Sequence, residues 1–304
     1  MTNDTVLNNP VSNNPISNNP VSDSPIPRVS IGALIDRYDL LLFDAYGVLV
    51  HSAGALSGAQ TTITRLRELG KPYAVLTNDA SKLPASAAQR YQGFGLDIPV
   101  DRIISSGLLL RGYFDKHDLH GADCIVLGTA DSNRFVEQAG GTVVPASSAC
   151  DVLVVGDENG YNFVETVDAT LSTLFRAIDA GKPVRLVLPN PDLIFPHGED
   201  RFGIAAGSVA LIIEAALRRR YPQRRDLVFD RLGKPKGDLY EAAMNRFGTR
   251  NAVMVGDQLE TDIAGAAACG IDSALIATGV SVVNNATSAA SIRPTYWMPS
   301  LNDD

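Results

Sequence analysis

Short apolar runs alternate with segments of helical period along the chain from Ile31 onward. The run Leu40-Leu41-Leu42-Phe43 contains no polar position, which predicts a buried strand. Residues 57–69 carry apolar side chains at helical spacing, and Gly70 follows them as a C-terminal cap. This alternation continues to residue 277, and it predicts an α/β fold in which helices cover both faces of a parallel sheet.

The same two patterns predict the remaining elements. Further strands are expected at residues 73–76, 124–127, 151–155, 184–188, 227–229, 253–255 and 274–277. Further helices are expected at residues 86–92, 133–139, 164–180, 209–219, 239–247 and 263–268.

The first 28 residues have a different composition. The triplet Asn-Asn-Pro recurs at residues 8–10, 13–15 and 18–20. Proline at every fifth position removes backbone donors and blocks a helix, and the segment has too little apolar surface to offset the entropy of ordering. Residues 1–28 are therefore predicted to form a disordered tail.

Charge and composition exclude several classes of protein. The formal net charge of −8 disfavours a nucleic-acid partner, which would require a basic face. No apolar run approaches the roughly 20 residues that span a bilayer, so no membrane association is expected. The cysteines Cys124, Cys150 and Cys269 are widely spaced and match neither a disulfide framework nor a zinc site. A cytoplasmic protein acting on a small molecule is the resulting expectation.

Polar residues stand at the predicted carboxyl ends of several strands, where ligands bind in open α/β sheets. These residues are Asp44, Thr77, Asn78, Lys234, Asp257 and Asp262. A carboxylate at a strand end can attack phosphorus, while a hydroxyl, backbone amides and an ammonium group can hold the phosphoryl oxygens. A group of carboxylates can hold Mg²⁺, which lets two anions approach each other. The pattern therefore points to phosphoryl transfer.

Four motifs in this order resemble those of the haloacid dehalogenase superfamily. They are Asp-x-x-Gly-Val-Leu at residues 44–49, Thr77-Asn78, Gly-Lys-Pro at residues 233–235 and Gly-Asp-x-x-x-x-Asp at residues 256–262. The α/β segment between the second and third motifs is similar to the insert of class IIA, the NagD-type sugar-phosphate, nucleotide and 4-nitrophenyl phosphatases. The resemblance extends over roughly residues 35 to 300.

The resemblance implies a Rossmann-like, doubly wound core from residues 29–107 and 226–304, with an inserted α/β cap from residues 108–225. It implies a small phosphorylated substrate and an aspartyl-phosphate intermediate on Asp44. Thr77, Asn78 and Lys234 would bind the phosphate, and Lys234 would also take part in catalysis. Asp44, Asp257, Asp262 and the backbone carbonyl of Tyr46 would hold Mg²⁺. Cap-side contacts with the substrate are expected from Asn190, Asp192 and Glu158. The apolar helix at residues 209–217 is either core or a homodimer contact.

Position 46 departs from the family pattern. The phosphatases have a second aspartate there, which protonates the leaving oxygen and then activates water, whereas this chain has Tyr46. A phenol can donate a proton but is a poor base at neutral pH. Three interpretations stay open: a phosphatase in which Tyr46 replaces the usual acid–base group, a 2-haloacid dehalogenase-like hydrolase, and a non-catalytic protein that binds a phosphorylated ligand. The pair Asp257 and Asp262 favours phosphate over halide, because carbon–halogen hydrolysis has no use for it.

Overall fold

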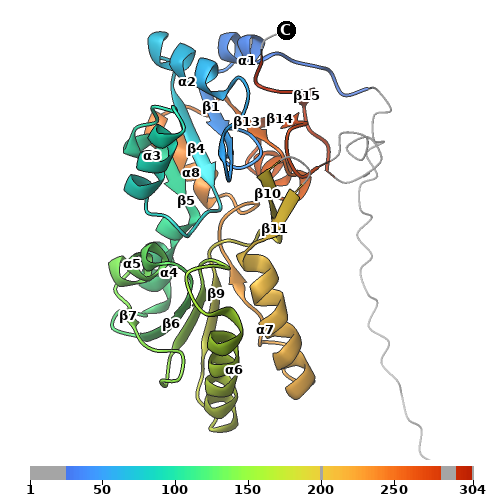
Figure 1. Ribbon diagram of the computed structural model, residues 1–304. Helices are drawn as coiled ribbons and strands as arrows, with labels where there is room; N and C mark the ends of the chain where they lie inside the picture. The colour runs from blue at the N-terminus through green and yellow to red at the C-terminus, as the bar shows by residue number, and fades with distance from the viewer. Residues whose placement is uncertain (1–24, 199–200, 282–291, 303–304) are drawn as a thin grey trace, which may run out of the picture.

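Figure 1 shows the computed structural model, which describes residues 25–198, 201–281 and 292–302. Two parallel β-sheets form two units, one above the other in this view. The six-stranded sheet of the upper unit is built from both ends of the chain, and the five-stranded sheet of the lower unit from its middle. The predicted α/β class, with a doubly wound core and an inserted second unit, is confirmed. We call the two units the core and the cap.

The core sheet has the strand order β15-β14-β13-β1-β4-β5, and all its pairings are parallel. Its strands are β1 (Leu40–Phe43), β4 (Tyr73–Thr77), β5 (Ile103–Ser105), β13 (Ala252–Gly256), β14 (Asp272–Ile276) and β15 (Tyr296–Met298). The first strand lies in the middle, because β4 pairs on one side of it and β13 on the other. A strand order that reverses in this way opens a crevice at the carboxyl ends of the strands.

Helices cover both faces of the core sheet. One face carries α1 (Ile31–Arg37), α2 (Ala59–Glu68) and α3 (Pro84–Gly93). The other face carries α8 (Asp238–Phe247) and α9 (Ala264–Ala268). In β1, Leu41 and Phe43 pack on the first face, and Leu40 and Leu42 on the second. All four side chains are fully buried, which explains the uninterrupted apolar run.

The cap sheet has the order β12-β9-β8-β6-β7 and is also parallel. Its strands are β6 (Asp123–Leu127), β7 (Thr142–Val143), β8 (Val152–Val155), β9 (Arg185–Leu188) and β12 (Asp230–Arg231). Four helices flank it: α4 (Leu109–His117) and α5 (Ala130–Gln138) on one face, α6 (Phe163–Asp179) and α7 (Ala206–Arg220) on the other.

Two short hairpins and three other turns of helix complete the described chain. The hairpins are β2 (Val50–His51) with β3 (Gly54–Ala55), and β10 (Ile194–Gly198) with β11 (Arg201–Ile204). The helical turns are η1 (Val100–Arg102), η2 (Ser106–Leu108) and η3 (Leu259–Ile263). The β10–β11 hairpin belongs to the cap segment but lies between the two sheets, with β10 against β2 of the core (Figure 1).

Most predicted strands and helices are confirmed within a few residues, but the strand predicted at residues 227–229 is wrong. Leu227 and Phe229 are buried in the apolar layer under α7, and the amide of Phe229 donates to the Glu214 carboxylate at 2.9 Å. Their apolar alternation thus reflects packing and not sheet pairing. The strand β12 follows instead, and its pairing with β9 carries the cap sheet to Arg231, beyond residue 225, where the sequence predicted the return to the core.

The predicted disordered tail lies outside the described residues up to position 24. Its last residues contradict the prediction, because Ile26 is buried against Leu259 and Ile263. The backbone of this end pairs beside β15: Trp297 donates its amide to Pro27 and accepts from Val29, both at 3.0 Å. An apolar side chain that finds a place in the core thus orders this end of the segment.

Among the described residues, no helix combines the length and apolar character that crossing a membrane requires.

Candidate active site

Asp44 stands at the carboxyl end of the central strand β1. Its amide continues the sheet by donating to Val255 at 2.9 Å, which fixes the backbone, and the residue is only 6% exposed. The ammonium group of Lys234 lies 2.6 Å from Asp44 Oδ1 and 2.6 Å from Asp262 Oδ1. It also donates to the carbonyl of Leu76 at 3.1 Å. One fully buried cation therefore joins two of the predicted carboxylates.

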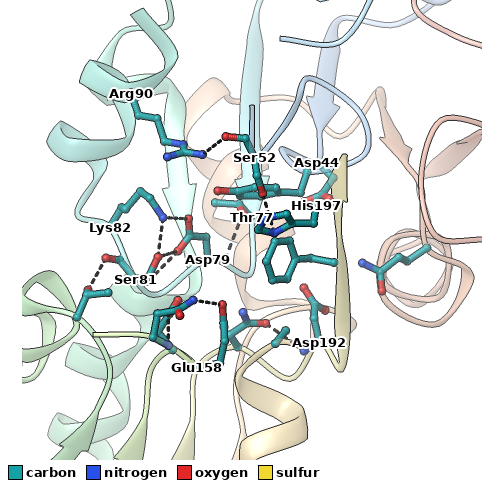
Figure 2. Close-up of a pocket in the computed structure, with 18 residues that line it drawn as sticks. Asp44, Ser52, Thr77, Asp79, Ser81, Lys82, Arg90, Glu158, Asp192 and His197 are labelled. Carbon is teal, nitrogen blue, oxygen red and sulfur yellow. Dashed lines mark hydrogen bonds and ion pairs between the residues drawn. The ribbon is translucent and has the colours of Figure 1, made fainter. Parts of the chain in front are cut away.

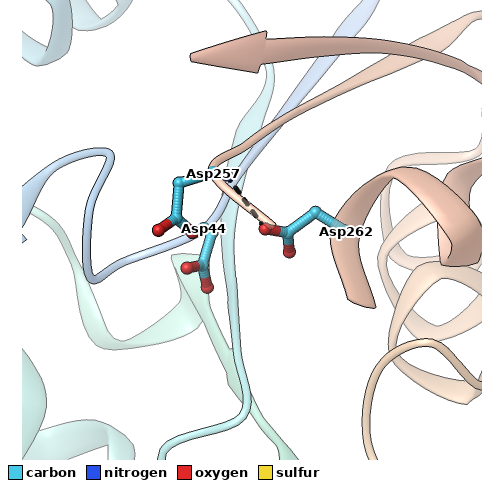
Figure 3. Close-up of side chains that lie close together, drawn as sticks. All are labelled: Asp44, Asp257 and Asp262. Carbon is cyan, nitrogen blue, oxygen red and sulfur yellow. Dashed lines mark hydrogen bonds between the residues drawn. The ribbon is translucent and has the colours of Figure 1, made fainter. Parts of the chain in front are cut away.

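The third carboxylate, Asp257, completes a compact group. Ligand oxygens of Asp44, Asp257 and Asp262 all lie within 4.8 Å of one another (Figure 3). Asp262 Oδ2 accepts from the amides of Asp257 and Gln258, both at 3.1 Å. Asp257 Oδ2 accepts from the amide of Val280 at 2.8 Å, while its Oδ1 is buried without a hydrogen-bond partner.

This donor set fits a hard divalent cation. A buried carboxylate oxygen without a partner is costly, and a cation bound there would satisfy it. Three carboxylates with one lysine leave an excess of negative charge, and oxygen ligands are those that Mg²⁺ prefers. The site thus has the composition and the unpaired oxygen that a cation would need.

Two glycines from distant parts of the chain pack directly against the side chain of Asp257. A Cβ on Gly47, which has a φ of +83°, or on Gly279 would overlap the Asp257 carboxylate. The backbone of the loop after β1 therefore packs directly on this side chain. The Gly of the first motif is explained by this close approach as well as by its left-handed conformation.

Burial and charge shift the protonation equilibria of the site. Burial raises the pKa of Asp44 to about 7, against the opposing effect of Lys234. Burial, with Asp44 and Asp262 nearby, raises the pKa of Asp257 well above its ordinary value. Burial alone would lower the pKa of Lys234, but Asp262 and Asp44 raise it well above its ordinary value. Excess negative charge is thus concentrated at the end of β1, where a cation would lower the two carboxylate pKa values.

The second motif supplies two residues with different roles. Thr77 ends β4 and lines the cavity above Asp44, and its hydroxyl accepts from the amide of Asp79 at 3.1 Å. The side chain of Asn78 does not line that cavity. Its Oδ1 accepts from the Lys234 amide at 2.8 Å, and its Nδ2 donates to the Lys234 carbonyl at 3.2 Å. The Asn78 side chain therefore supports Lys234, and only its backbone is left for the phosphate contact that the sequence predicted.

A cavity of about 480 Å³ opens between the core and the cap at this point (Figure 2). Core residues of its wall include Asp44, Tyr46, Ser52, Thr77, Asp79, Lys82 and Arg90, and cap residues include Asp157, Glu158, Asn190, Asp192, Phe195 and His197. The three cap residues predicted to contact a substrate, Asn190, Asp192 and Glu158, thus line the same cavity as Asp44.

Two of these cap carboxyl groups are strongly perturbed. Burial raises the pKa of Glu158 to about 7, with Asp157 adding to the effect. Burial also raises the pKa of Asp192 to about 6, against the opposing effects of Lys234 and of the hydrogen bond from Asn78. Perturbed carboxyl groups in a cavity are typical of functional sites.

Tyr46 faces the cap. Its ring meets that of Phe195 nearly edge-on, with the centroids 5.7 Å apart, and Phe195 in turn contacts His197. His197 Nδ1 lies 3.3 Å from Ser52 Oγ in the β2–β3 turn of the core. Burial, with a smaller effect of Asp79, raises the pKa of Tyr46, so its phenol stays protonated over a wide range of pH.

Sequence patterns did not identify Phe195, His197, Ser52, Lys82 or Arg90 as residues of the site. Phe195 and His197 belong to the β10–β11 hairpin, whose Pro196 and Gly198 interrupt any strand pattern. The available signal was the alternation of Phe195 and His197 beside the Asn190-Pro191-Asp192 turn.

Comparison with known proteins places this geometry in context. The family described as haloacid dehalogenase-like hydrolase matches residues 41–142, and the HAD-hydrolase-like family matches residues 231–304. A solved structure from Cytophaga hutchinsonii, described as a possible sugar phosphatase of the HAD superfamily, is 31% identical to the chain. That match covers 92% of this chain and 100% of the other, with a TM-score of 0.80.

Several similar proteins are named for an activity, and two of them illustrate the match. A dihydroxyacetone phosphatase of Corynebacterium glutamicum is 27% identical over 86% of this chain and 89% of its own length. The ribonucleotide monophosphatase NagD of Escherichia coli is 26% identical over 86% of this chain and 96% of its own length. The similarity extends over both core and cap in each case.

Proposed function

The chain belongs to the haloacid dehalogenase superfamily of hydrolases, and on that premise we propose that it is a magnesium-dependent phosphatase. Its substrate is a small phosphate monoester, and its intermediate is an aspartyl phosphate on Asp44. The observation that carries the proposal is the contact of Lys234 with Asp44 and Asp262, next to the unpaired oxygen of Asp257. Of these residues, Asp44 lines the cavity and the other three are buried behind it.

In the first step, a carboxylate oxygen of Asp44 attacks phosphorus as the bond from phosphorus to the leaving oxygen breaks. Sheet pairing on both sides of β1 fixes the backbone that leads into Asp44, and Lys234 holds its carboxylate, which reduces the entropy cost of alignment. Lys234 neutralises charge on the phosphoryl oxygens, and the Thr77 hydroxyl and the Asn78 amide orient them. The phenol of Tyr46 donates a proton to the leaving oxygen.

In the second step, water attacks phosphorus and the bond to Asp44 breaks, which regenerates the carboxylate. The Tyr46 phenolate left by the first step takes up the proton of this water, which restores the phenol. The pKa of Tyr46 is raised from an ordinary value near 10, so the phenol gives up its proton in the first step less readily than a carboxylic acid would. We expect turnover to be slow, or fastest with activated leaving groups.

Asp44, Asp257, Asp262 and the backbone carbonyl of Tyr46 would hold Mg²⁺. The cation would offset the repulsion between nucleophile and phosphate. The unpaired Asp257 Oδ1 and the excess of carboxylates at the site support this assignment.

The named activities of the relatives suggest the substrate class. They include a dihydroxyacetone phosphatase, a ribonucleotide monophosphatase and an acid sugar phosphatase of Staphylococcus aureus. We propose a sugar phosphate or nucleotide here too, with Asn190, Asp192 and Glu158 on the cap side of the binding cavity. A cavity of about 480 Å³ suits a leaving group of that size.

The test is release of phosphate from a panel of phosphate esters and from 4-nitrophenyl phosphate, with magnesium and with a chelator. The proposal expects magnesium-dependent release that Asp44→Asn abolishes. Metal-independent halide release from a 2-chloro acid would favour the dehalogenase alternative instead. Thermal stabilisation by phosphorylated ligands without any turnover would favour the non-catalytic one.

We further propose that the protein forms a homodimer through the exposed apolar residues of the β10–β11 hairpin and α7. Ile194, Phe202, Ile204, Leu211 and Ile212 are each 39–56% exposed on the β10–β11 hairpin and α7. Within the described residues, β11 pairs only with β10, so its other edge is open. An open strand edge is self-complementary about a two-fold axis, which favours a second copy as the occupant. Ile204→Glu should convert a dimer to a monomer in sedimentation equilibrium; a monomeric wild type would refute the proposal.

A further inference from the structure

The side chain of Asn78 connects three parts of the molecule. Its Oδ1 accepts from the Lys234 amide at 2.8 Å, and its Nδ2 donates to Asp192 Oδ1 at 2.9 Å and to the Lys234 carbonyl at 3.2 Å. Asn78 is 1% exposed. These partners fix the orientation of the amide, because only its oxygen can accept from the Lys234 N–H.

Asp192 is held rigidly by the cap. Its carbonyl accepts from the amide of Gly207 in the first turn of α7 at 3.0 Å, and its amide donates to Asn190 Oδ1 at 3.0 Å. Gly207 leaves no space for a Cβ, because the carbonyl oxygens of Pro191 and Asp192 occupy it. The position of the Asp192 carboxylate is therefore set by the position of α7.

On the core side, the loop with Lys234 packs directly on Asn78. A Cβ on Gly233, which has a φ of +60°, would overlap Asn78 Oδ1. The Lys234 side chain then extends from this backbone to Asp44. The hydrogen bonds thus form one continuous path from the cap, through Asp192, Asn78 and Lys234, to Asp44.

We propose that Asn78 is a positioning residue through which the cap sets the placement of Lys234. When the cap brings Asp192 onto Asn78, the charge-assisted hydrogen bond fixes the amide, and the amide holds both backbone groups of Lys234. When the cap moves away, the amide loses this partner and the Lys234 loop is less constrained. The site is therefore completed only with the cap seated. This inference rests on the proposed function, in which Lys234 is the cation beside the nucleophile.

A double-mutant cycle tests the path. Asp192→Ala and Asn78→Ala should each lower kcat/KM for 4-nitrophenyl phosphate about 10- to 100-fold, mainly through kcat. The double variant should be no worse than Asn78→Ala alone, because Asp192 acts through Asn78. Asp192→Asn should stay within about 3-fold of wild type, since an amide oxygen still accepts from Asn78 Nδ2. Additive losses would overturn the inference, because Asp192 would then act on the substrate directly.

A second measurement needs no activity. With selective ¹⁵N-lysine labelling, the amide resonance of Lys234 should shift in Asp192→Ala and stay near its wild-type position in Asp192→Asn. Asp168→Ala, an exposed cap aspartate, is the matched control and should leave it unmoved. An unmoved Lys234 amide in Asp192→Ala would overturn the inference. The comparison of Asp192→Ala with Asp192→Asn tests the inference even if Asn78→Ala does not fold. A wild type without turnover would count against the proposed function alone.

Discussion

The ring of Tyr46 in the core meets the ring of Phe195 in the cap, with the centroids 5.7 Å apart and the planes at 73°. This edge-to-face contact joins the loop after β1 to the β10–β11 hairpin. The residue that replaces the family's second aspartate is therefore also a contact between core and cap. In the proposed mechanism, position 46 bears on both proton transfer and the contact between core and cap.

Variants at position 46 separate these two effects. Tyr46→Phe keeps the ring contact and removes the proton donor, so kcat for alkyl phosphates should fall about 10-fold or more. With 4-nitrophenyl phosphate, whose leaving group needs little protonation, the loss should stay within about 3-fold. Tyr46→Asp restores the family's acid–base group and should raise kcat, with a higher KM from the lost ring contact. Equal losses on both substrates in Tyr46→Phe would show that the phenol is not the donor.

Lys234 is the buried cation between two carboxylates, so its removal should affect both folding and activity. Lys234→Ala should lower the free energy of unfolding by about 3 kcal/mol, because it leaves buried carboxylates without their partner. It should also lower kcat about 100- to 1,000-fold. Urea unfolding and steady-state kinetics measure the two effects. Lys236→Ala is the matched control: this lysine lies two residues on, is exposed, and should tolerate the change.

Asp257 should control metal affinity. Its Oδ1 is buried without a partner, so Mg²⁺ should raise the melting temperature of the wild type by supplying one. Asp257→Asn should remove most of that increase and weaken Mg²⁺ binding in calorimetry by about 10-fold or more. Glu260→Gln, an exposed neighbour in η3, should bind Mg²⁺ like the wild type. Undiminished Mg²⁺ binding in Asp257→Asn would place the metal elsewhere.

Glu158 should make stability depend on pH. Its pKa is raised to about 7 in the folded protein from an ordinary value of 4.5, so the folded state binds the proton more tightly than the unfolded state. Stability from this group is fully present below pH 4.5 and is lost as the pH rises through about 7. Glu158→Gln removes the cost of burying the charged carboxylate. The free energy of unfolding of this variant, relative to that of the wild type, should therefore rise by about 1 kcal/mol from pH 5 to pH 8, after allowance for solvent screening.

Thermal melts of wild type and Glu158→Gln at the two pH values measure this gain. The difference in melting temperature between Glu158→Gln and the wild type should be about 2–4 °C larger at pH 8 than at pH 5. The exposed Glu137→Gln serves as the control and should show no such change. A constant difference between wild type and Glu158→Gln would contradict the raised pKa.

Much of the fold could be predicted because buried parallel strands leave a clear mark on sequence. Leu40–Phe43 is buried on both faces, so no polar residue interrupts it. Leu227 and Phe229 misled the prediction because side chains that pack under a helix can alternate as those of a strand do. The β10–β11 hairpin gave no clear signal, since Pro196, Gly198 and Gly203 interrupt it and its contacts are with another part of the chain.

The candidate site, like the fold, could be predicted from the sequence only in part. The motifs after β1 and β13 could be placed together, because these neighbouring parallel strands end at one edge of the core sheet, which brings Asp44 to Asp257. Lys234 follows β12 of the cap sheet, so its contact with Asp44 does not follow from strand order. The direction of the Asn78 side chain could not be predicted, because it depends on Asp192, which lies 114 residues away in the chain. Residues of the cap enter the site only through tertiary packing.

The most direct test of the account is to trap the intermediate. Enzyme mixed with 4-nitrophenyl phosphate and Mg²⁺, then quenched in acid, should carry a phosphate adduct on the peptide that contains Asp44, and hydroxylamine should remove it. The adduct should be absent from Asp44→Asn. Continued turnover with no adduct on Asp44, or with an adduct on another residue, would contradict the central claim that Asp44 is the nucleophile.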